Sequence, residues 1–532
     1  LIAELLAGET AAAPCKLDPP FNPETTEYTL NAEAAFSVIP WSRVNGQTLR
    51  FRTGNADGSP MGEWTPILSG SATPVMPYSI GKSRLEIEVA APDGALKKTY
   101  MLNVTMRPLP PAFSDTDGYY FSDRSISLTH GNPATEIKYT ADGADPETAG
   151  TVYTSPITVP VKPEPTLLRA CAVQDGIASR PVAAVWTYKE PPEMVKIGNG
   201  TVNLRAQASG TADNAYIVQI SPFLMGKYEV TQDLYEAVTG TNPSYSIGAL
   251  KPVEQVSWND AIVFCNMLSV AQGLEPVYTV SGSTNPADWG DDYKFLDNIT
   301  LEASVNRYAS GYRLPTEAEW IFAARGGSGA TEPYTTYAGG NVYSSYAWLS
   351  MNSLNASHEV GKKLPNAAGL YDMSGNANEI CDDWYSSSIP DTGAADPTGP
   401  VAGSNKVILG GHWNNDATLF NRMYNSPYYT NNYNGFRLVR IDPAATDILA
   451  LVNPEPDAHL LTGEQWTAPM NIIPYYADKD LITWQSDKPT IASAASGTVT
   501  AHATGTAVIQ AAAGTVKTEW TVTVRTASTA ST

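Results

Sequence analysis

The chain has 532 residues, with 33 Lys and Arg against 54 Asp and Glu, which gives a formal net charge of −21. This length is too great for a single hydrophobic core, so we expect several domains. Nucleic acids and anionic membranes need a basic protein face, and the charge argues against both as partners. No apolar run reaches the ~18 residues of a membrane-spanning helix, so we expect no membrane span. The 40 Pro, 41 Gly and 16% charged residues indicate strands and turns rather than long helices.

Neither the start of the chain nor its cysteines shows a recognisable functional motif. The chain begins at Leu1 without a Met or a basic-then-apolar leader, which is expected of a mature fragment whose targeting segment has been removed. The four cysteines form no CxxC motif, so a zinc ribbon and a thioredoxin motif are excluded. Only Cys265 and Cys381 fall in one predicted domain. They form either a disulfide or two separate buried thiols.

Residues 1–106 are predicted to form an all-β unit. Two segments alternate apolar and polar residues, Leu85–Val89 and Thr99–Val104, and the turn residues Pro92-Asp93-Gly94 lie between them. The segment LDPPFNPETTEY, from Leu17 to Tyr28, resembles the cadherin-like β-sandwich of bacterial surface proteins. This resemblance implies a structural spacer.

A second β unit, residues 112–189, follows the stiff linker Pro108-Leu109-Pro110-Pro111. Strands are expected at Ile137–Thr140 and Leu167–Val173, with turn residues at 142–146. The order of these segments resembles the C-terminal β-sandwich that is appended to chitobiases and many surface enzymes. The resemblance implies another spacer, with carbohydrate binding as the alternative.

Helical patterns appear in residues 194–441, after the boundary at Pro191-Pro192. Apolar spacing and capping residues predict three helices. These are residues 231–239, residues 257–272 with Ser257 as N-cap, and a helix that starts at the Thr316–Glu319 capping box and stops at Gly326-Gly327.

Residues 444–525 return to β patterns. The segments Ile482–Ser486, Gly497–Ala501 and Gly505–Ile509 resemble the bacterial immunoglobulin-like repeat of adhesins. Such repeats present or space other domains, so no active site is expected there. Residues 526–532 are predicted to be a disordered tail or linker.

The middle domain carries a series of motifs in the order of one family. The motifs are EVTQ (Glu229–Gln232), NPS (Asn242–Ser244), Pro252–Ala261, FCN (Phe264–Asn266), GYRLPTEAEW (Gly311–Trp320), AARGG (Ala323–Gly327), Asn366–Asn376 and GFR (Gly435–Arg437). The domain resembles the sulfatase-modifying factor family, whose founder is the formylglycine-generating enzyme. The resemblance implies a variant of the C-type lectin fold. The expected fold class is thus multidomain, with β-sandwiches flanking an α+β C-type-lectin-like domain of the formylglycine-generating-enzyme type.

The residues for the family's oxidation chemistry are missing. The resemblance implies two copper-binding cysteines, five residues apart after a Gly-Gly pair, which oxidise a substrate Cys to formylglycine. Aligned on Gly410-Gly411, these positions are Asn415 and Phe420, and neither side chain is the thiolate that copper requires. We therefore expect no copper and no such enzyme activity. A related iron-dependent branch needs three His, and this domain has only His358 and His412.

The resemblance also implies a structural calcium site. Its ligands would be Asp372, in place of the family's Asn, with Gly375, Ala377 and Glu379. Alternatively, Asp372 and Glu379 cap turns and solvate a loop. The family has Trp-Glu-Trp where this chain has Asn378-Glu379-Ile380, which departs from the pattern.

One pair of neighbouring acids, Asp382-Asp383, suggests the two carboxylates of a glycosidase. Adjacent residues on a strand point to opposite faces, so they make a poor acid/base couple. A solvated role or a role at the edge of the calcium site is expected instead.

The segment Gly410–Arg440 has the composition of a binding surface. Seven Asn and four Tyr fall within its 31 residues. Tyr offers a large, stiff contact area and Asn adaptable hydrogen bonding. The predicted ligand-binding residues are Asn414, Asn415, Asp416, Thr418, Phe420, Asn421, Tyr424, Tyr428, Tyr429, Asn431, Asn432 and Tyr433.

These observations lead to competing hypotheses. The first is a non-catalytic, monomeric, extracellular binding protein of the bacterial cell surface, whose ligand is a protein or glycan on another cell, phage or host surface. In its sharper form it is a variable protein of a diversity-generating retroelement, because such systems mutate adenines and turn Asn codons into Tyr, Asp or Ser codons. The alternatives are an oxidoreductase with divergent chemistry in the same pocket and a purely structural surface protein.

Overall fold

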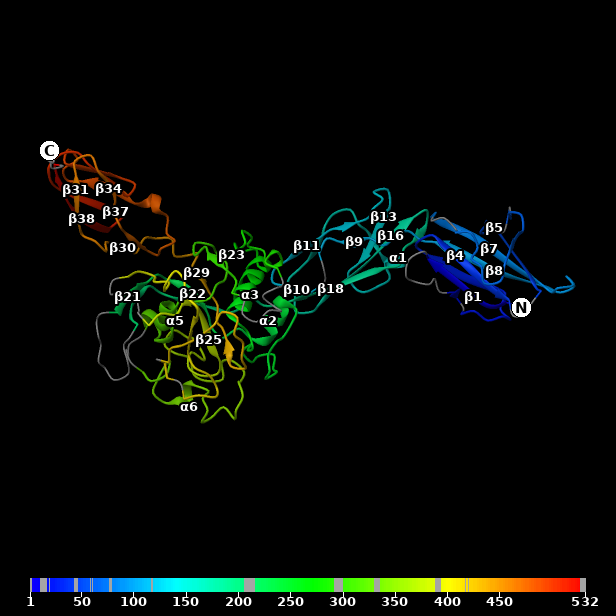
Figure 1. The fold of residues 1–532 in the computed structure, drawn as a ribbon, viewed down its shortest axis with the longest axis horizontal. Helices are drawn as coiled ribbons and strands as arrows, with labels where there is room; N and C mark the ends of the chain where they lie inside the picture. Colours follow the sequence, from blue (N-terminus) through cyan, green and yellow to red (C-terminus); the bar gives the residue numbers. More distant parts are fainter. Residues whose placement is uncertain are drawn as a thin grey trace, which may run out of the picture. The chain divides into compact units, whose positions relative to one another are not determined.

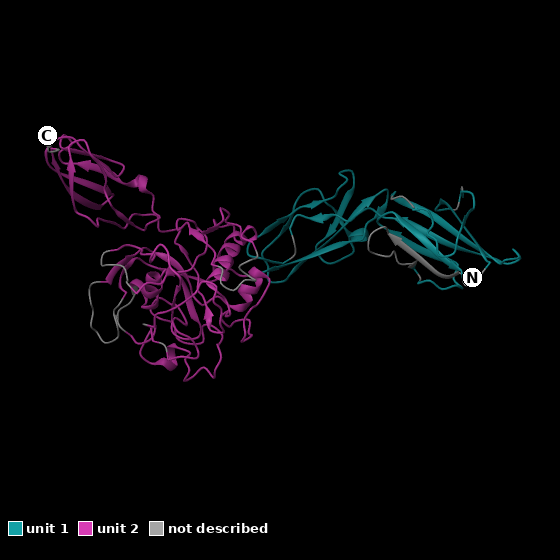
Figure 2. Ribbon diagram, in the orientation of Figure 1, with its two compact units in different colours: residues 1–188 teal, residues 189–532 magenta. Residues whose placement is uncertain are grey.

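Four large hydrophobic cores form along the chain in the computed structural model, within residues 28–106, 120–186, 197–439 and 448–524. By contacts the chain divides into two units, Leu1–Tyr188 and Lys189–Thr532 (Figure 2), which are described separately below. The structure describes residues 2–9, 17–18, 20–42, 46–57, 59, 61–75, 79–115, 118–204, 216–290, 300–329, 335–387, 394–416, 418–419 and 421–526. Leu1, Cys15, Phe420 and most of the predicted tail therefore lie outside the described residues.

A six-stranded sheet dominates the first part of unit 1, in the order β2-β3-β8-β7-β5-β6. The alternating segments predicted from the sequence lie in β7 and β8, which pair antiparallel across the Pro92-Asp93-Gly94 turn. Their alternation places Tyr100, Leu102 and Val104 in the core. The strands are β1 (Ile2–Glu9), β2 (Leu17–Asp18), β3 (Glu27–Ala32), β4 (Phe36–Ser42), β5 (Thr48–Asn55), β6 (Thr65–Ile67), β7 (Gly81–Ala90) and β8 (Lys97–Met106).

The second part of unit 1 is also built from strands, with a main path β10-β18-β16-β13-β14. The predicted strands at residues 137–140 and 167–173 lie in β13 and β16, which pair antiparallel. Its elements are β9 (Ala112–Phe113), β10 (Gly118–Tyr120), β11 (Arg124–Ile126), β12 (Leu128–Thr129), β13 (Glu136–Thr140), α1 (Pro146–Ala149), β14 (Thr151–Val152), β15 (Ile157–Val159), β16 (Thr166–Gln174), β17 (Ile177–Ala178) and β18 (Val182–Tyr188).

Unit 2 begins with a mixed α and β region that carries the three predicted helices (Figure 1). Ser257 caps the second helix, and its hydroxyl accepts from the Asp260 amide at 3.2 Å. Thr316 and Glu319 form the predicted capping box of the third. The helices and 3-10 turns are α2 (Gln232–Thr239), α3 (Trp258–Ala271), η2 (Pro286–Asp288), α5 (Glu317–Ala324), η3 (Gly327–Gly329) and α6 (Tyr343–Tyr346).

Short strands hold this region together, chiefly a four-stranded sheet in the order β27-β26-β25-β28 and a three-stranded sheet β19-β22-β29. In the first sheet, the strand that carries Glu379 pairs on one side with β26, which ends directly before the segment 410–440, and on the other with β28 near the end of this segment. The strands are β19 (Met194–Ile197), β20 (Gly200–Asn203), β21 (Ile217–Ile220), β22 (Phe223–Gly226), β23 (Tyr278–Val280), β24 (Ala303–Val305), β25 (Asn378–Trp384), β26 (Lys406–Leu409), β27 (Met423–Asn425), β28 (Asn434–Gly435) and β29 (Val439–Ile441).

The C-terminal part of unit 2 is again β, with the predicted strands found in β34, β36 and β37. Two sheets have the orders β31-β38-β37-β34 and β32-β36-β35, and β30 pairs with β33. Its elements are β30 (Ala450–Val452), β31 (Asp457–Leu461), β32 (Gln465–Thr467), β33 (Asn471–Ile473), η4 (Lys479–Leu481), β34 (Thr483–Ser486), β35 (Ala492–Ala495), β36 (Thr498–Ala501), β37 (Gly505–Ala513) and β38 (Val516–Arg525).

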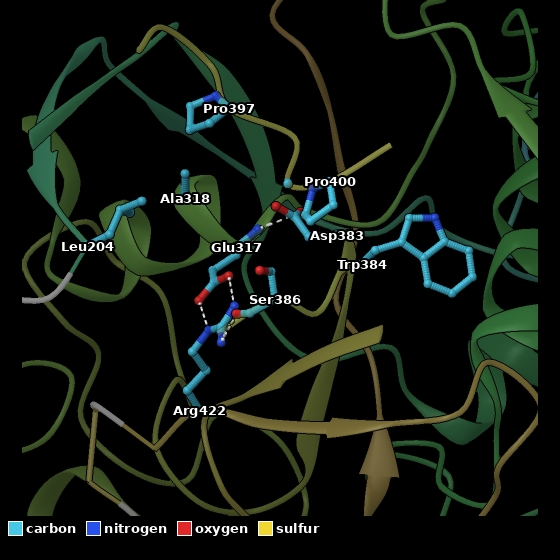
Figure 3. Close-up of a pocket in the computed structure, with 10 residues that line it drawn as sticks. Leu204, Glu317, Ala318, Asp383, Trp384, Ser386, Pro397, Pro400 and Arg422 are labelled. Atoms are coloured by element: carbon cyan, nitrogen blue, oxygen red, sulfur yellow. Dashed lines mark hydrogen bonds and ion pairs between the residues drawn. The ribbon is translucent and has the colours of Figure 1, made fainter. Parts of the chain in front are cut away.

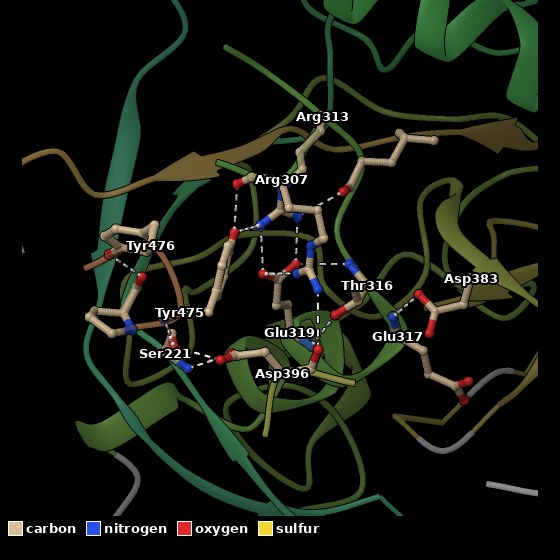
Figure 4. Close-up of polar contacts among 12 residues, drawn as sticks. Ser221, Arg307, Arg313, Thr316, Glu317, Glu319, Asp383, Asp396, Tyr475 and Tyr476 are labelled. Carbon is tan, nitrogen blue, oxygen red and sulfur yellow. Dashed lines mark hydrogen bonds and ion pairs between the residues drawn. The ribbon is translucent and has the colours of Figure 1, made fainter. Parts of the chain in front are cut away.

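A buried polar network links this C-terminal part to the helical region (Figure 4). Arg313 binds both oxygens of Glu319 at 2.7 Å, and Arg307 reaches the same carboxylate at 3.1 Å. The Tyr475 hydroxyl accepts from Arg313 at 3.3 Å and donates to the carbonyl of Arg307 at 3.1 Å. Although burial alone would raise the pKa of Glu319, its pairing with the two arginines lowers it to about 2.

Cys171, Cys265 and Cys381 are free, buried thiols, so the two cysteines of the middle domain do not form a disulfide. Burial raises the pKa of all three thiols. Within the described ranges, no helix is both long enough and apolar enough to cross a bilayer.

Candidate functional site

A buried ion pair supports the segment 410–440 from beneath. Arg437 donates from Nη2 to Glu379 Oε1 at 2.6 Å and from Nε to Oε2 at 2.9 Å, and both side chains are fully buried. The indole of Trp320 donates to the same Oε2 at 2.7 Å. Arg437 also binds the carbonyls of Gly226 and Tyr371, so one side chain connects several loops to β25.

Tight backbone packing sets the position of the neighbouring loop. Gly375 has φ 76°, and a Cβ at this position would overlap the carbonyl oxygen of Trp348. Only glycine therefore fits this contact. The next residue, Asn376, also has a positive φ of 61°, and its amide donates to the same carbonyl at 2.9 Å.

Three carboxylates share this interior with a single guanidinium. Glu229 accepts from the amide of Ala377 at 2.8 Å and from Asn376 at 2.7 Å. Burial, reinforced by the charges of Asp372 and Glu379, raises the pKa of Glu229 well above its usual range. Burial likewise raises the pKa of Asp372 to about 6. The sequence reasoning missed Glu229, although its EVTQ motif was noted, because nothing local marks it as buried.

Of the residues predicted to bind calcium, Asp372 is arranged in a way that suits a cation and Glu379 is not. The acids outnumber the one Arg, and Asp372 Oδ1 is buried without a hydrogen-bond partner among the described residues. Asp372 thus fits a cation. Glu379 does not fit as it is arranged, because Arg437 and Trp320 already bind its two oxygens. Among the residues that the structure describes, no group of three His, Cys, Asp or Glu is placed to hold a metal ion. Calcium binding stays a prediction.

The position aligned with the first copper cysteine is part of the loop framework. Asn415 accepts the amide of His412 at 3.1 Å through its side chain, and its carbonyl accepts the amide of Ser350 at 3.1 Å. These bonds fix the turn that follows Gly410-Gly411. The second aligned position, Phe420, lies outside the described residues.

The two histidines of the domain are each held by an aromatic ring. His358 stacks on Trp348 with ring centroids 3.7 Å apart, and its Nε2 contacts the carbonyl of Ser353 at 2.8 Å. His412 stacks on Tyr433 at 4.1 Å. Burial lowers the pKa of His412 to about 4, so this imidazole is neutral at neutral pH. Both rings serve packing in this arrangement.

Among the predicted ligand-binding residues that the structure describes, four are the most exposed. Tyr424 and Tyr429 are 51% and 46% exposed, and Asn414 and Asp416 are also classed as exposed. Two aromatic side chains and two short polar ones are therefore the most accessible described members of the predicted set. Tyr424 leans on Tyr385, with ring centroids 4.3 Å apart.

Other members of the predicted set are half-buried and stabilise the loop itself. Asn431 accepts the amides of Tyr433 and Asn434 at 3.0 and 2.7 Å, and its carbonyl accepts from Gln255. The carbonyl of Asn432 accepts from the indole of Trp413 at 3.3 Å. The side-chain bonds of Asn431 form a turn, so this Asn side chain is engaged within the loop.

An apolar turn next to the face was not predicted. The Ser350 hydroxyl hydrogen-bonds with the Asp416 carboxylate, which joins the turn to the predicted face. Met351 is 57% and Leu354 88% exposed, and Leu354 has a positive φ of 55°. A strained, exposed Leu is unusual. Single-sequence patterns could not find it, since the strain is visible only in the backbone.

The expected role for the acids Asp382-Asp383 needs a correction. The two side chains do line different pockets, in agreement with the alternation of a strand. Asp383, however, is buried rather than solvated, and it accepts the amide of Glu317 at 2.9 Å (Figure 3). Burial and then the nearby Glu317 raise its pKa to about 8.

Comparison with known proteins identifies the class of this domain. Residues 182–441 match the family described as sulfatase-modifying factor enzyme 1-like domain, and residues 116–184 match the chitobiase/beta-hexosaminidase C-terminal domain. The chain belongs to the sulfatase-modifying factor family through the first of these regions.

Two curated relatives and one solved structure illustrate the similarity. The chain is 38% identical over 214 residues to the chaperone protein LppX of Paenibacillus barcinonensis, covering 36% of this chain and 75% of that protein. It is 29% identical over 231 residues to the formylglycine-generating enzyme of Thermomonospora curvata, covering 36% and 72%. Treponema denticola variable protein 1 is 33% identical, with 49% of this chain and 96% of that chain covered and a TM-score of 0.41.

Proposed function

We propose that residues 182–441 form a non-catalytic ligand-binding domain and that its ligand contacts the exposed residues Asn414, Asp416, Tyr424 and Tyr429. The observation that carries this proposal is the role of Asn415. At the place where the family's enzymes are expected to keep a copper-binding cysteine, this side chain holds a turn instead. Exposed tyrosines beside short polar side chains form a typical recognition surface.

The state of the cysteines supports a role without thiol chemistry. Cys265 and Cys381 are fully buried, and burial raises the pKa of both well above the ordinary value. A buried neutral thiol is a poor nucleophile and a poor ligand for soft metals. A copper-loaded thiol oxidase assay on the full chain, with a cysteine-containing peptide, should therefore show no turnover. Turnover that a chelator abolishes would favour the divergent oxidoreductase instead.

The proposal also covers the class of ligand and the location of the protein. A protein or glycan on another cell, phage or host surface suits an exposed face with aromatic and polar side chains. The flanking β regions, which we take as β-sandwiches and an immunoglobulin-like domain, suit a stalk that displays this domain on the outside of a bacterial cell. A monomer meets these requirements, and the acidic charge argues against nucleic acid as a partner.

The retroelement hypothesis concerns how the face varies between genes. Its support here is that the Asn- and Tyr-rich positions lie between two fixed ends, Gly410-Gly411 and Gly435–Arg437, which are buried. The genomic DNA tests it. A nearby reverse transcriptase gene and a near-identical repeat that differs at adenines would support diversification, and their absence would exclude it.

Binding itself is tested with defined glycan and protein arrays. The full chain should bind a subset of spots, and the double variant Tyr424→Ala, Tyr429→Ala should lose them. Tyr433, stacked on His412, is a poor choice because its removal would disturb the loop. Tyr119, a 47% exposed tyrosine of unit 1, provides the matched control Tyr119→Ala.

A further inference from the structure

A pocket of about 270 Å³ lies beside the first turn of α5 (Figure 3). Its walls are largely apolar, with a few polar side chains that converge on the space. This is the composition of small-ligand sites. The apolar lining consists of Leu204, Ala318, Trp384, Pro397 and Pro400, and the polar lining of Glu317, Asp383, Ser386 and Arg422.

Two of the charged groups neutralise each other. Arg422 donates from Nη2 to Glu317 Oε2 at 2.9 Å, and its Nε forms a second, shorter bond to Oε1. Arg422 also donates to the carbonyl of Ser386 at 2.8 Å. The guanidinium lies over the ring of Tyr385, 4.3 Å from its centroid. The Glu317–Arg422 pair is thus complete within the protein.

Asp383 is the remaining acidic group of the pocket, and it is not part of the Glu317–Arg422 ion pair. Its Oδ2 accepts the amide of Glu317, and no cationic side chain in the described part of the chain forms an ion pair with it. A buried carboxylate without a counter-charge is costly, and the group stays protonated instead. The neighbouring charges include Asp382, which adds to the effect, and Arg307, which opposes it. On the other side of the strand, Lys406 donates to the carbonyl of Asp382 and lies between Trp258 and Trp384.

The Pro397–Pro400 loop packs closely against this carboxyl group, and both line the pocket. Gly399 has φ 69°, and a Cβ at this position would lie 3.0 Å from Asp383 Oδ1. A side chain at position 399 would crowd Asp383, and glycine avoids that contact.

We propose that this pocket binds a primary alkylammonium group, with the ammonium at Asp383 and the methylene chain against Ala318, Leu204 and Pro397. A cation at this position would form the ion pair that no described side chain forms with Asp383. Apolar walls suit an alkyl chain. Lysine side chains behave in the same way, because their methylene stem packs on apolar surface while the charged head stays in a polar environment. The net charge of −21 favours cationic ligands at long range. The source is either a lysine side chain of a protein ligand or a free amine.

Binding of such a cation must be linked to a proton. The unliganded Asp383 carboxyl is protonated at neutral pH, because burial and the charge of Glu317 raise its pKa to about 8. The ammonium favours the ionised form, so one proton leaves Asp383 as the cation binds. Affinity therefore rises with pH up to about 8, by as much as ~10-fold per pH unit, and then levels off.

Calorimetric titration of the full chain with n-butylamine tests this proposal. Titrations at pH 6, 7 and 8, in two buffers with different ionisation enthalpies, should show saturable binding and release of close to one proton at pH 6. Asp383→Asn keeps the size and an acceptor for the Glu317 amide, and it should weaken binding at least ~10-fold and remove the pH dependence. Asp382→Asn, the neighbour that lines the other pocket, is the matched control and should keep saturable, pH-dependent binding, with its pH dependence moved to lower pH because the charge of Asp382 helps to raise the pKa of Asp383.

Two further ligands distinguish a lysine side chain from a free amine as the source of the ammonium group. A third, n-butanol, tests whether the positive charge is needed. N-acetyl-lysine methylamide binding as well as n-butylamine indicates a lysine side chain, whereas binding of cadaverine alone indicates a free amine. Absence of saturable n-butylamine binding, equal binding of n-butanol, or unchanged binding by Asp383→Asn overturns the proposal. Tyr429→Ala alone leaves the contact of Tyr424 with Tyr385 beside Arg422 intact and should keep amine binding, so failure of the exposed face and failure of this pocket are distinguishable.

Discussion

Arg437 and Glu379 form a fully buried, two-bond ion pair directly beneath the segment that carries the candidate ligand face. Glu379 belongs to β25, and Arg437 follows β28, which pairs with β25 in parallel. The pair therefore fixes the C-terminal end of the face to the sheet below it. Its burial makes it expensive to break from one side, since the remaining charge would have no partner.

Replacement of Arg437 by Leu should strongly destabilise unit 2. The change leaves Glu379 without its guanidinium, next to the buried acids Glu229 and Asp372. We expect a loss of ~3–5 kcal/mol in the free energy of unfolding, measured by chemical denaturation. The exposed pair Lys362–Glu359 gives the comparison, and Lys362→Ala should cost less than ~1 kcal/mol. Similar losses for both variants would refute the structural role of the buried pair.

Two glycines with similar backbone angles should respond differently to alanine. Gly369 has φ 86° and open space where a Cβ would be, whereas a Cβ on Gly375 would overlap the carbonyl of Trp348. Gly369→Ala should cost only the ~1–2 kcal/mol of the left-handed conformation. Gly375→Ala adds a steric clash with backbone and should prevent folding of the domain, observed as loss of its thermal transition. Equal thermal stability of the two variants would contradict the packing of this loop.

Asp383 should make stability depend on pH. Its pKa is raised to about 8 in the folded state, against 3.8 for the ordinary group, so the folded chain holds this proton more tightly than the unfolded chain. Its contribution is complete below about pH 4 and declines as the pH rises to 8. Between pH 5 and 7 the free energy of unfolding of wild type should fall relative to that of Asp383→Asn by up to ~1.4 kcal/mol per pH unit. Parallel pH profiles for the two proteins would show that Asp383 is not buried in this way.

Calcium should stabilise the chain through Asp372 if the predicted site exists. Thermal unfolding in excess EGTA and in calcium should then differ, with the midpoint higher in calcium. At a concentration ~100 times the dissociation constant, the gain is ~2.7 kcal/mol. Asp372→Asn should remove the difference, because its Oδ1 is the buried oxygen left without a partner among the described residues. Identical midpoints with and without calcium would exclude the site.

The sequence was sufficient where local chemistry determines the structure. The Thr316–Glu319 capping box, the Ser257 cap and the alternation of residues 85–89 and 99–104 all depend on neighbours in the chain, and all are confirmed. The family resemblance was likewise predictable, because it rests on ordered motifs.

Contacts between distant segments could not be read from local patterns. Nothing near Glu229 shows that it shares an interior with Asp372 and Glu379, roughly 150 residues further on. The same holds for Asp383, whose burial depends on α5 and the Pro397–Pro400 loop. Within the predicted face, composition could not separate the exposed Tyr429 from Asn431, because only the folded loop shows which Asn side chains form turns.

The most direct test of the central claim compares binding by three forms of the full chain on one glycan and protein array. Wild type and Tyr119→Ala should bind the same spots, and Tyr424→Ala, Tyr429→Ala should lose them, with affinity at least ~30-fold weaker for each spot. The reason is that Tyr424 and Tyr429 are the most exposed aromatic side chains among the described residues of the face. An array without specific binding, or binding that the double variant retains at wild-type affinity, would contradict the assignment of this face as the ligand-binding site.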